Sequence, residues 1–274
     1  IGFGRIEIFT KPGSDRFRGS VFGSFTDEAL NARNPFAPTR PSEQDRRYGG
    51  NVGGPLGKRA SFFFDFERRE SDDNTTINAV VLDPTFTPVP FASTFFQPQR
   101  RTTFAPRFDF QTSENNTLIV RYEFENNRRA GQGVGNFALP TAEVESLERE
   151  NELTITNTYI VNPSMVSETR LRLERETNET RAVDQSGLPR LVVSDAFVDR
   201  SSAGVAETVD RRFEIQQNFS LIRGNHTVRT GVRVRGVKLE TSSTSNFVGT
   251  FTFAGAGELT SIEQYQNVLS GVTG

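Results

Sequence analysis

Apolar and polar residues alternate along most of the chain with a period of two, which is the spacing of side chains on one face of a β-strand. The clearest case is "HTVRTGVRVRGVKLE" (His226–Glu240). There Val228, Val232 and Val234 share one parity, and Arg229, Arg233 and Arg235 share the other. Helical periodicity is scarce. A strand of this kind needs an apolar environment on one side and water on the other.

The same alternation predicts nine strands. Their expected ranges are Arg18–Glu28, Arg46–Leu56, Ser61–Arg68, Thr103–Gln111, Thr117–Asn126, Glu152–Ile160, Val166–Glu176, Arg211–Leu221 and His226–Glu240. Most of them set aliphatic or phenylalanine side chains against charged or hydroxyl side chains. The pattern therefore indicates an all-β protein.

The connections between these strands alternate between short and long. Turn residues fill the short ones at Gly57–Ala60, Thr112–Asn116, Val161–Met165 and Ile222–Asn225. The long ones are polar and cover about Ala29–Asp45, Asp72–Arg100, Asn126–Glu148 and Glu176–Val209. Tight turns on one rim and long loops on the other are typical of an outer-membrane barrel. We therefore predict an antiparallel up-and-down transmembrane β-barrel segment.

Period two alone leaves a second interpretation open. A soluble all-β binding or adhesion module would show the same alternation, with its charged faces outward and its phenylalanine faces packed together as a sandwich core. The strands are long enough for the roughly 9–11 residues that a tilted membrane strand needs, which favours the barrel. The discriminating observation is whether the apolar faces pack against each other.

Composition narrows the function classes. Lys plus Arg is 32 and Asp plus Glu is 34, so we expect no nucleic-acid partner, which would favour a basic face. There is no Cys and His226 is the single His, which gives no disulfide framework and no His-based metal site or relay. No apolar run approaches the roughly 18 residues of a membrane helix, and no signal peptide is visible. We expect no cofactor, no metal, no catalytic residue and no enzyme activity.

One stretch resembles a known family. "IEIFTKPGSDRFRGSVFGSFTDEALNARNPFA" (Ile6–Ala37) resembles the junction between plug and barrel in TonB-dependent outer-membrane receptors, where a final plug strand leads into the first barrel strand. The segments Tyr48–Leu56, Ser61–Glu67 and Ser245–Gly255 resemble the Oar-like branch. The family usually has His where Arg18 stands and Ser where Pro12 stands.

The resemblance implies a domain division and a set of partners. Residues 1–15 would be the C-terminal end of a plug domain, and residues 16–274 would be the N-terminal part of a barrel, cut from a longer protein. The implied function is binding or TonB-dependent uptake of an unidentified substrate across the bacterial outer membrane. The implied partners are outer-membrane lipid, the plug and remaining barrel strands, and the TonB complex acting through the plug.

The two parities give two sets of candidate residues. The apolar set is expected to face lipid or form an aromatic girdle: Phe62, Phe64, Phe66, Phe108, Phe110, Leu118, Val120, Tyr122, Phe124, Val228, Val232 and Val234. The charged set is expected to face the lumen, as paired charges of a hydrated wall or as contacts to plug or substrate: Arg121, Glu123, Arg170, Arg172, Glu174, Arg229, Arg233 and Arg235. A Pro- and Phe-rich segment, Asp83–Gln99, is expected to be a loop that meets a ligand or folds over the barrel mouth.

Overall fold

The computed structural model describes residues 15–30 and 44–272. Within these ranges nine long strands form one antiparallel sheet in the order β1-β2-β3-β4-β5-β6-β7-β10-β11, so almost every strand pairs with its neighbour in sequence. The strands are β1 (Arg18–Asp27), β2 (Gln44–Pro55), β3 (Ala60–Leu82), β4 (Pro88–Ser113), β5 (Asn116–Gln132), β6 (Val144–Asn162), β7 (Met165–Ala182), β10 (Val205–Arg223) and β11 (His226–Ser243). All nine expected strands are confirmed as members of this sheet. The expected plug end, residues 1–15, lies almost wholly outside the described residues.

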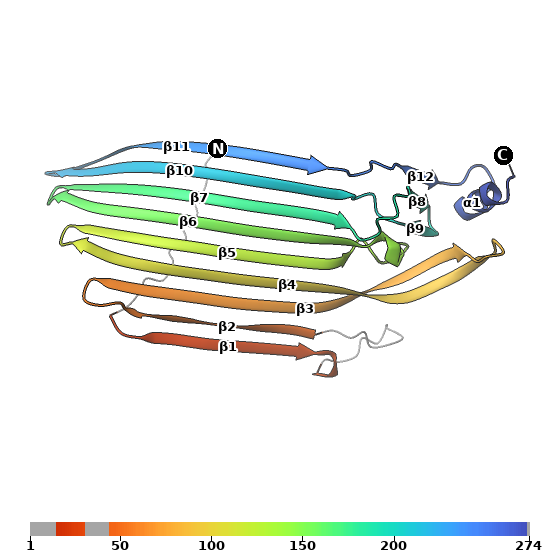
Figure 1. The fold of residues 1–274 in the computed structure, drawn as a ribbon, viewed down its shortest axis with the longest axis horizontal. Helices are drawn as coiled ribbons and strands as arrows, with labels where there is room; N and C mark the ends of the chain where they lie inside the picture. The colour runs from red at the N-terminus through yellow and green to blue at the C-terminus, as the bar shows by residue number, and fades with distance from the viewer. Residues whose placement is uncertain (1–14, 31–43, 273–274) are drawn as a thin grey trace.

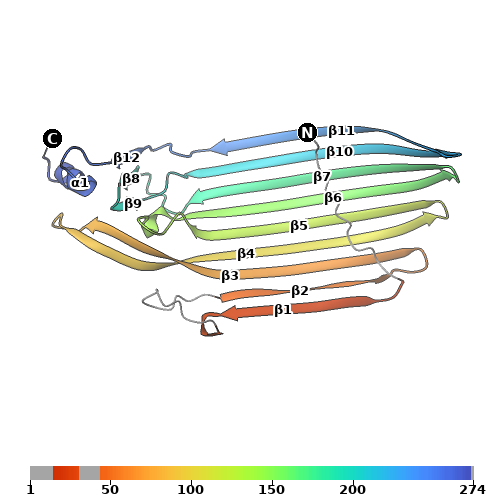
Figure 2. The same ribbon diagram turned by 180° about the vertical axis from the view of Figure 1, so that it is seen from behind.

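The tight turns lie together at one end of the sheet, which we call the turn rim (Figure 1). They join β2 to β3, β4 to β5, β6 to β7 and β10 to β11. The β3–β4, β5–β6 and β7–β10 connections lie at the opposite end, the loop rim, as the reverse view also shows (Figure 2). Gly224, in the β10–β11 turn, has a φ of 59°, a conformation that glycine adopts without steric cost.

One expected loop is wrong. The segment Asp72–Arg100 is not a long loop, because β3 and β4 continue through it as a hairpin of 23 and 26 residues that closes at Asp83–Thr87. The prolines that suggested a loop, Pro88, Pro90 and Pro98, share one parity with Phe110. The residues at the alternate positions of β4 form their backbone hydrogen bonds with β3. The Gln111 N–H, for example, donates to the Arg59 carbonyl. The prolines therefore turn their missing N–H groups away from β3, and β4 pairs with β5 only from Gln99 onward.

Two other long connections, β5–β6 and β7–β10, are shorter than expected and contain structure of their own. Strand β5 runs to Gln132 and β6 starts at Val144, with the short 3-10 helix η2 (Pro140–Ala142) between them. The connection from β7 to β10 contains β8 (Arg190–Val193) and β9 (Phe197–Asp199), and the chain after β11 forms β12 (Thr250–Phe253) and α1 (Ser261–Leu269). A second 3-10 helix, η1 (Glu28–Leu30), follows β1. None of the helices in residues 15–30 and 44–272 has the length and hydropathy of a membrane-spanning helix.

These short elements form a small unit at the loop rim, which we call the cap: β8, β9, β12 and α1 (Figure 1). The order of its sheet is β12-β8-β9, with β12 parallel to β8. Its core includes Val193, Ala196 and Phe197, and it packs on Ile77 and Ala79 of the extended hairpin. Phe91 and Phe95 of β4 also pack against this core. The long hairpin therefore supports the cap, and the buried apolar core lies there.

The large sheet is a single layer. Many of its apolar side chains are exposed, among them Val232 at 62% and Val228 at 56%. No second sheet packs on this apolar surface within the described residues. A soluble sandwich would have to bury it, so the fold favours the barrel segment over the soluble module.

Candidate functional site

The pairing of the strands divides the sheet into two chemically distinct faces. Residues directly opposite each other across an antiparallel ladder point to the same side. Glu152 pairs with both Glu123 and Glu174, and Arg170 pairs through Gln216 with Arg233. Charged residues of neighbouring strands thus share one side, which we call the polar face. The opposite side is the apolar face.

The structure puts the two candidate sets on opposite faces. Every residue of the charged set lies on the polar face, and every residue of the apolar set lies on the apolar face. Aromatic contacts join neighbouring strands on the apolar face, with the Phe64 and Phe104 ring centroids 4.8 Å apart. The Pro- and Phe-rich segment divides: Phe91 and Phe95 pack on the cap core, while Phe86 and Phe96 are exposed.

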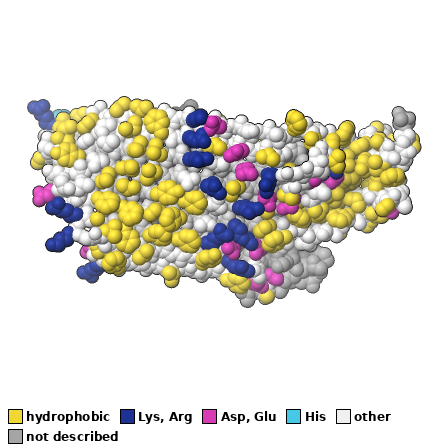
Figure 3. Space-filling model, viewed as in Figure 1, with side chains coloured by type: hydrophobic (Ala, Val, Ile, Leu, Met, Phe, Trp, Pro, Cys, Tyr) yellow, Lys and Arg dark blue, Asp and Glu magenta, His cyan; other side chains and the backbone are white. Residues whose placement is uncertain are grey.

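The apolar face is interrupted by a band of charge. Figure 3 shows this face, with hydrophobic side chains covering the part next to the turn rim and a band of Lys, Arg, Asp and Glu crossing all the strands beyond it. On six strands a cation of this band lies ten positions from an apolar residue or tyrosine at or near the turn rim. The pairs are Arg100–Phe110, Arg128–Leu118, Arg149–Tyr159, Arg175–Met165, Arg211–Leu221 and Lys238–Val228.

Ten residues have the length of a membrane crossing. At about 3.3 Å per residue and a tilt of about 40°, they rise about 25 Å. This matches the apolar band of about 25 Å on outer-membrane barrels. The same spacing recurs on strands whose turns and sequences differ, so the band is a property of the whole sheet.

The centre of the polar face holds a network of ion pairs. Glu152 and Glu174 are buried, at 8% and 9% exposure, and both bind the guanidinium group of Arg172, at 2.7 and 2.9 Å. Arg121 lies 3.3 Å from Glu152, and Arg212 lies 2.7 Å from Glu174. Each buried carboxylate therefore has two arginine partners. Because these charges are paired with one another, the network stabilises the sheet and leaves little charge free to bind a ligand.

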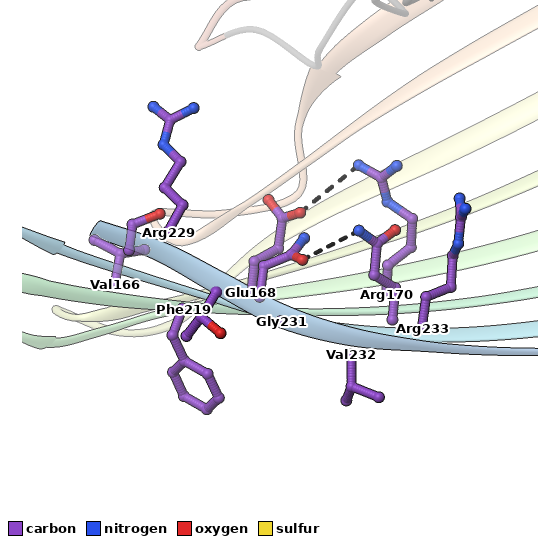
Figure 4. Close-up of a pocket in the computed structure, with 12 residues that line it drawn as sticks. Val166, Glu168, Arg170, Phe219, Arg229, Gly231, Val232 and Arg233 are labelled. Atoms are coloured by element: carbon purple, nitrogen blue, oxygen red, sulfur yellow. Dashed lines mark hydrogen bonds and ion pairs between the residues drawn. The ribbon is translucent and has the colours of Figure 1, made fainter. Parts of the chain in front are cut away.

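Toward the turn rim the polar face is less saturated. A hollow of about 510 Å³ is lined by Arg170, Arg229, Arg233, Gln216 and Asn218. Figure 4 shows Arg229, Arg170 and Arg233 rising on one side of the sheet, while Phe219 and Val232 point to the other. Arg170 lies 3.8 Å from Glu168. Across the described residues, neither Arg229 nor Arg233 has an ion pair or hydrogen bond from its side chain.

The remaining two candidates are paired. Arg235 lies 3.5 Å from Glu214, and Glu123 lies 3.9 Å from Arg121. Sequence reasoning missed the partners Glu152, Glu214 and Arg212, because alternation gives the face of a residue and not the register of its strand. The unpaired Arg229 and Arg233, with Arg170, are thus the candidate binding residues that the structure singles out.

A family model described as the outer membrane beta barrel domain matches residues 9–92 and 84–273. The chain belongs to this outer-membrane β-barrel family. Its place is therefore the bacterial outer membrane, in contact with lipid, and the soluble module is excluded. The expected fold class is confirmed. Membership in a family of membrane barrels also points away from a role as an enzyme.

Solved structures share the fold. The outer-membrane transporter YddB from Escherichia coli matches with a TM-score of 0.59 and 10% identity, over 84% of this chain and 32% of that one. A mutant of the ferric enterobactin receptor PfeA from Pseudomonas aeruginosa matches with a TM-score of 0.56 and 13% identity, over 91% and 34%. The siderophore receptor PirA from Acinetobacter baumannii matches with a TM-score of 0.56 and 10% identity, over 86% and 32%. The chain spans about a third of these proteins, and no curated protein matches it.

Proposed function

We propose that the chain is part of the wall of a TonB-dependent, Oar-like outer-membrane receptor that binds or imports a substrate. The proposal is supported by the sheet with one apolar and one charged face, bounded by tight turns on one rim and long connections on the other. It is also supported by the sequence Ile6–Ala37, which resembles a junction between plug and barrel. In this proposal residues 1–15 end the plug, and residues 16–274 begin the barrel.

The two faces then have different surroundings. The apolar face contacts lipid over a depth that matches its ten-residue apolar band. The polar face lines a hydrated lumen that the plug fills. The ion-pair network around Glu152 and Glu174 keeps the wall rigid, while Arg229 and Arg233 remain available for anionic groups of the plug or of a substrate.

The names of the similar structures do not decide the substrate. Two of them are siderophore receptors, but identities of 10% and 13% carry the fold and not the ligand. Substrate choice in such a protein depends on loops and plug, so we propose the transport class without a substrate.

The 274 residues contain no cysteine, so the orientation can be tested with cysteines introduced here, once any cysteine elsewhere in the full-length protein is replaced by serine. Single-cysteine variants Val232→Cys and Arg233→Cys would be made in the full-length protein and probed in intact outer membranes. We expect a membrane-impermeant maleimide to label Arg233→Cys once the plug is released with denaturant, and to leave Val232→Cys unlabelled. A lipid-soluble nitroxide should quench a fluorophore at Val232→Cys alone. The reverse pattern would exclude the proposed orientation.

Dependence on TonB needs a separate test. The full-length protein should migrate as a heat-modifiable band from outer-membrane fractions and should bind the purified periplasmic domain of TonB. A barrel that folds correctly but shows no TonB binding, with or without candidate ligands, would contradict TonB-dependent function while leaving the fold intact.

A further inference from the structure

Each of eight neighbouring strands, from β2 to β11, carries one cation on the apolar face where the hydrophobic part of that face ends. We call this set the cation row: Arg46, Arg68, Arg100, Arg128, Arg149, Arg175, Arg211 and Lys238. It forms the basic part of the charged band in Figure 3. Between the row and the turn rim, the described strands carry no charged side chain on this face except Arg223, which ends β10 at the rim itself.

Several members of the row lie directly opposite each other. Arg100 pairs with Arg128 across β4 and β5. Arg175, Arg211 and Lys238 are directly opposed across β7, β10 and β11. Neighbouring strands are about 4.8 Å apart, and like charges at that separation repel and destabilise a sheet. The row therefore concentrates positive charge at a cost to the isolated sheet.

The protein supplies only part of the compensating negative charge. Within the described residues, the carboxylates that contact the row belong to Glu70, Asp72, Glu145 and Glu240. Glu240 binds both Arg211 and Lys238. Arg149 reaches only the Asn126 side-chain oxygen, at 3.4 Å. Arg175 is exposed and has no side-chain partner in the part of the chain that the structure describes.

The position of the row indicates which anion completes it. The row follows the loop-rim boundary of an apolar band that is about 25 Å deep. At this boundary the acyl chains of a lipid end and its head group begins. Phe66, Phe104 and Phe124 lie on the turn-rim side of this boundary and offer contact to acyl chains. Thr102 and Asn126, directly opposite each other on β4 and β5, add hydrogen-bonding groups at head-group level.

We propose that the cation row binds phosphate groups of lipid head groups in the leaflet on the loop-rim side of the membrane. Arginine binds phosphate through two parallel N–H donors. Adjacent strands place two cations within reach of one phosphate, which turns the cross-strand repulsion into shared binding of an anion. The inference rests on the proposed orientation of the apolar face toward lipid, and is independent of TonB and of any substrate.

The test compares two full-length variants with the unmodified protein. The row variant carries Arg175→Gln, Arg211→Gln and Lys238→Gln. The matched control carries Arg47→Gln, Arg69→Gln and Arg101→Gln, three arginines directly opposite each other on the polar face, so it removes the same charge from that face. Binding of lipid A with two phosphates, and of the same lipid with both phosphates removed, would be measured by native mass spectrometry on detergent-solubilised protein.

We expect the row variant to bind the phosphorylated lipid about tenfold more weakly than the unmodified protein, a change of about 1.4 kcal/mol. The control should bind it as the unmodified protein does, and removal of the phosphates should abolish the difference. Equal losses in the row variant and the control would reduce the effect to net charge and overturn the proposal.

The proposal can still be tested if the row variant fails to fold. If that variant loses its heat-modifiable band, the test is the binding of the two lipids, with and without phosphates, to the unmodified protein. Equal binding of both lipids would overturn the proposal. Cysteine labelling with the reversed pattern would instead refute the proposed orientation, and loss of TonB binding would refute only the transport class.

Discussion

A charge placed in the middle of the apolar face tests the membrane depth of the sheet. Val232 and Val228 lie on this face of β11 with similar exposure, 62% and 56%. Val228 is at the turn rim, ten positions from Lys238, and Val232 is four positions further along the strand. At about 2.5 Å of depth per tilted residue, Val232 lies about 10 Å inside the apolar band and close to its midplane.

The expected costs follow from this depth. An arginine at the midplane of a membrane barrel costs about 2–4 kcal/mol, and one near the interface costs about 0–1 kcal/mol. We therefore expect Val232→Arg to destabilise the full-length protein by about 2–4 kcal/mol and Val228→Arg by no more than about 1 kcal/mol. The two substitutions introduce the same side chain on the same strand, so exposure and strand propensity cancel.

The measurement is a denaturant titration of the protein refolded into lipid vesicles, with the heat-modifiable band as the readout of the folded state. Arg233→Lys is the control on the opposite face and should leave the midpoint unchanged. Equal costs for Val232→Arg and Val228→Arg would refute the depth assignment, because a surface in water has no midplane.

Further predictions concern the ion-pair network and the cap. Glu152→Ala should cost about 1–3 kcal/mol in the same titration, because it removes the buried carboxylate shared by Arg121 and Arg172, whereas Glu152→Gln should recover part of that loss; equal values for both would contradict the network. Phe197→Ala should cost about 3–5 kcal/mol locally, seen as faster hydrogen exchange across the cap with the long strands still protected; exchange that rises across the whole sheet would show that the cap is not a separate unit. Hydrogen bonds from the backbone and side chain of Thr260 lower the pKa of Glu263. At pH values above the ordinary pKa of glutamate, the capping box therefore stabilises α1. This stabilisation is lost as the pH falls through the lowered pKa. Acidification should lower the protection factors of the amides in the first turn of α1, taken relative to their intrinsic exchange rates at each pH, and a Glu263→Gln variant should lack this loss of protection.

The sequence predicts the large sheet well, because a strand whose two faces contact different environments must alternate apolar and polar side chains. The nine strands and the face of every candidate residue follow from that rule alone. Register does not, because it depends on which residues of two strands meet. The partnership of Arg172 with both Glu152 and Glu174 therefore appears only in the structure.

Two misreadings have a common cause. The extended β3–β4 hairpin and the cap lie beyond the membrane band, where the two faces of a strand no longer contact different environments. Prolines in β4 resembled loop residues, because only the structure shows that their N–H side has no partner strand. The three- and four-residue strands of the cap are too short for alternation to be visible.

The parallel pair of β8 and β12 has a consequence for the order of folding. Arg190 and Thr250 are directly paired although they are sixty positions apart, and the β10–β11 hairpin lies between them in sequence. Each long strand can add to its predecessor through a nearby turn, but the cap must close a large loop, with the entropy cost that this carries. We expect the cap to complete after β11 has been added to the wall, so that the loop rim stays open while the strands are assembled.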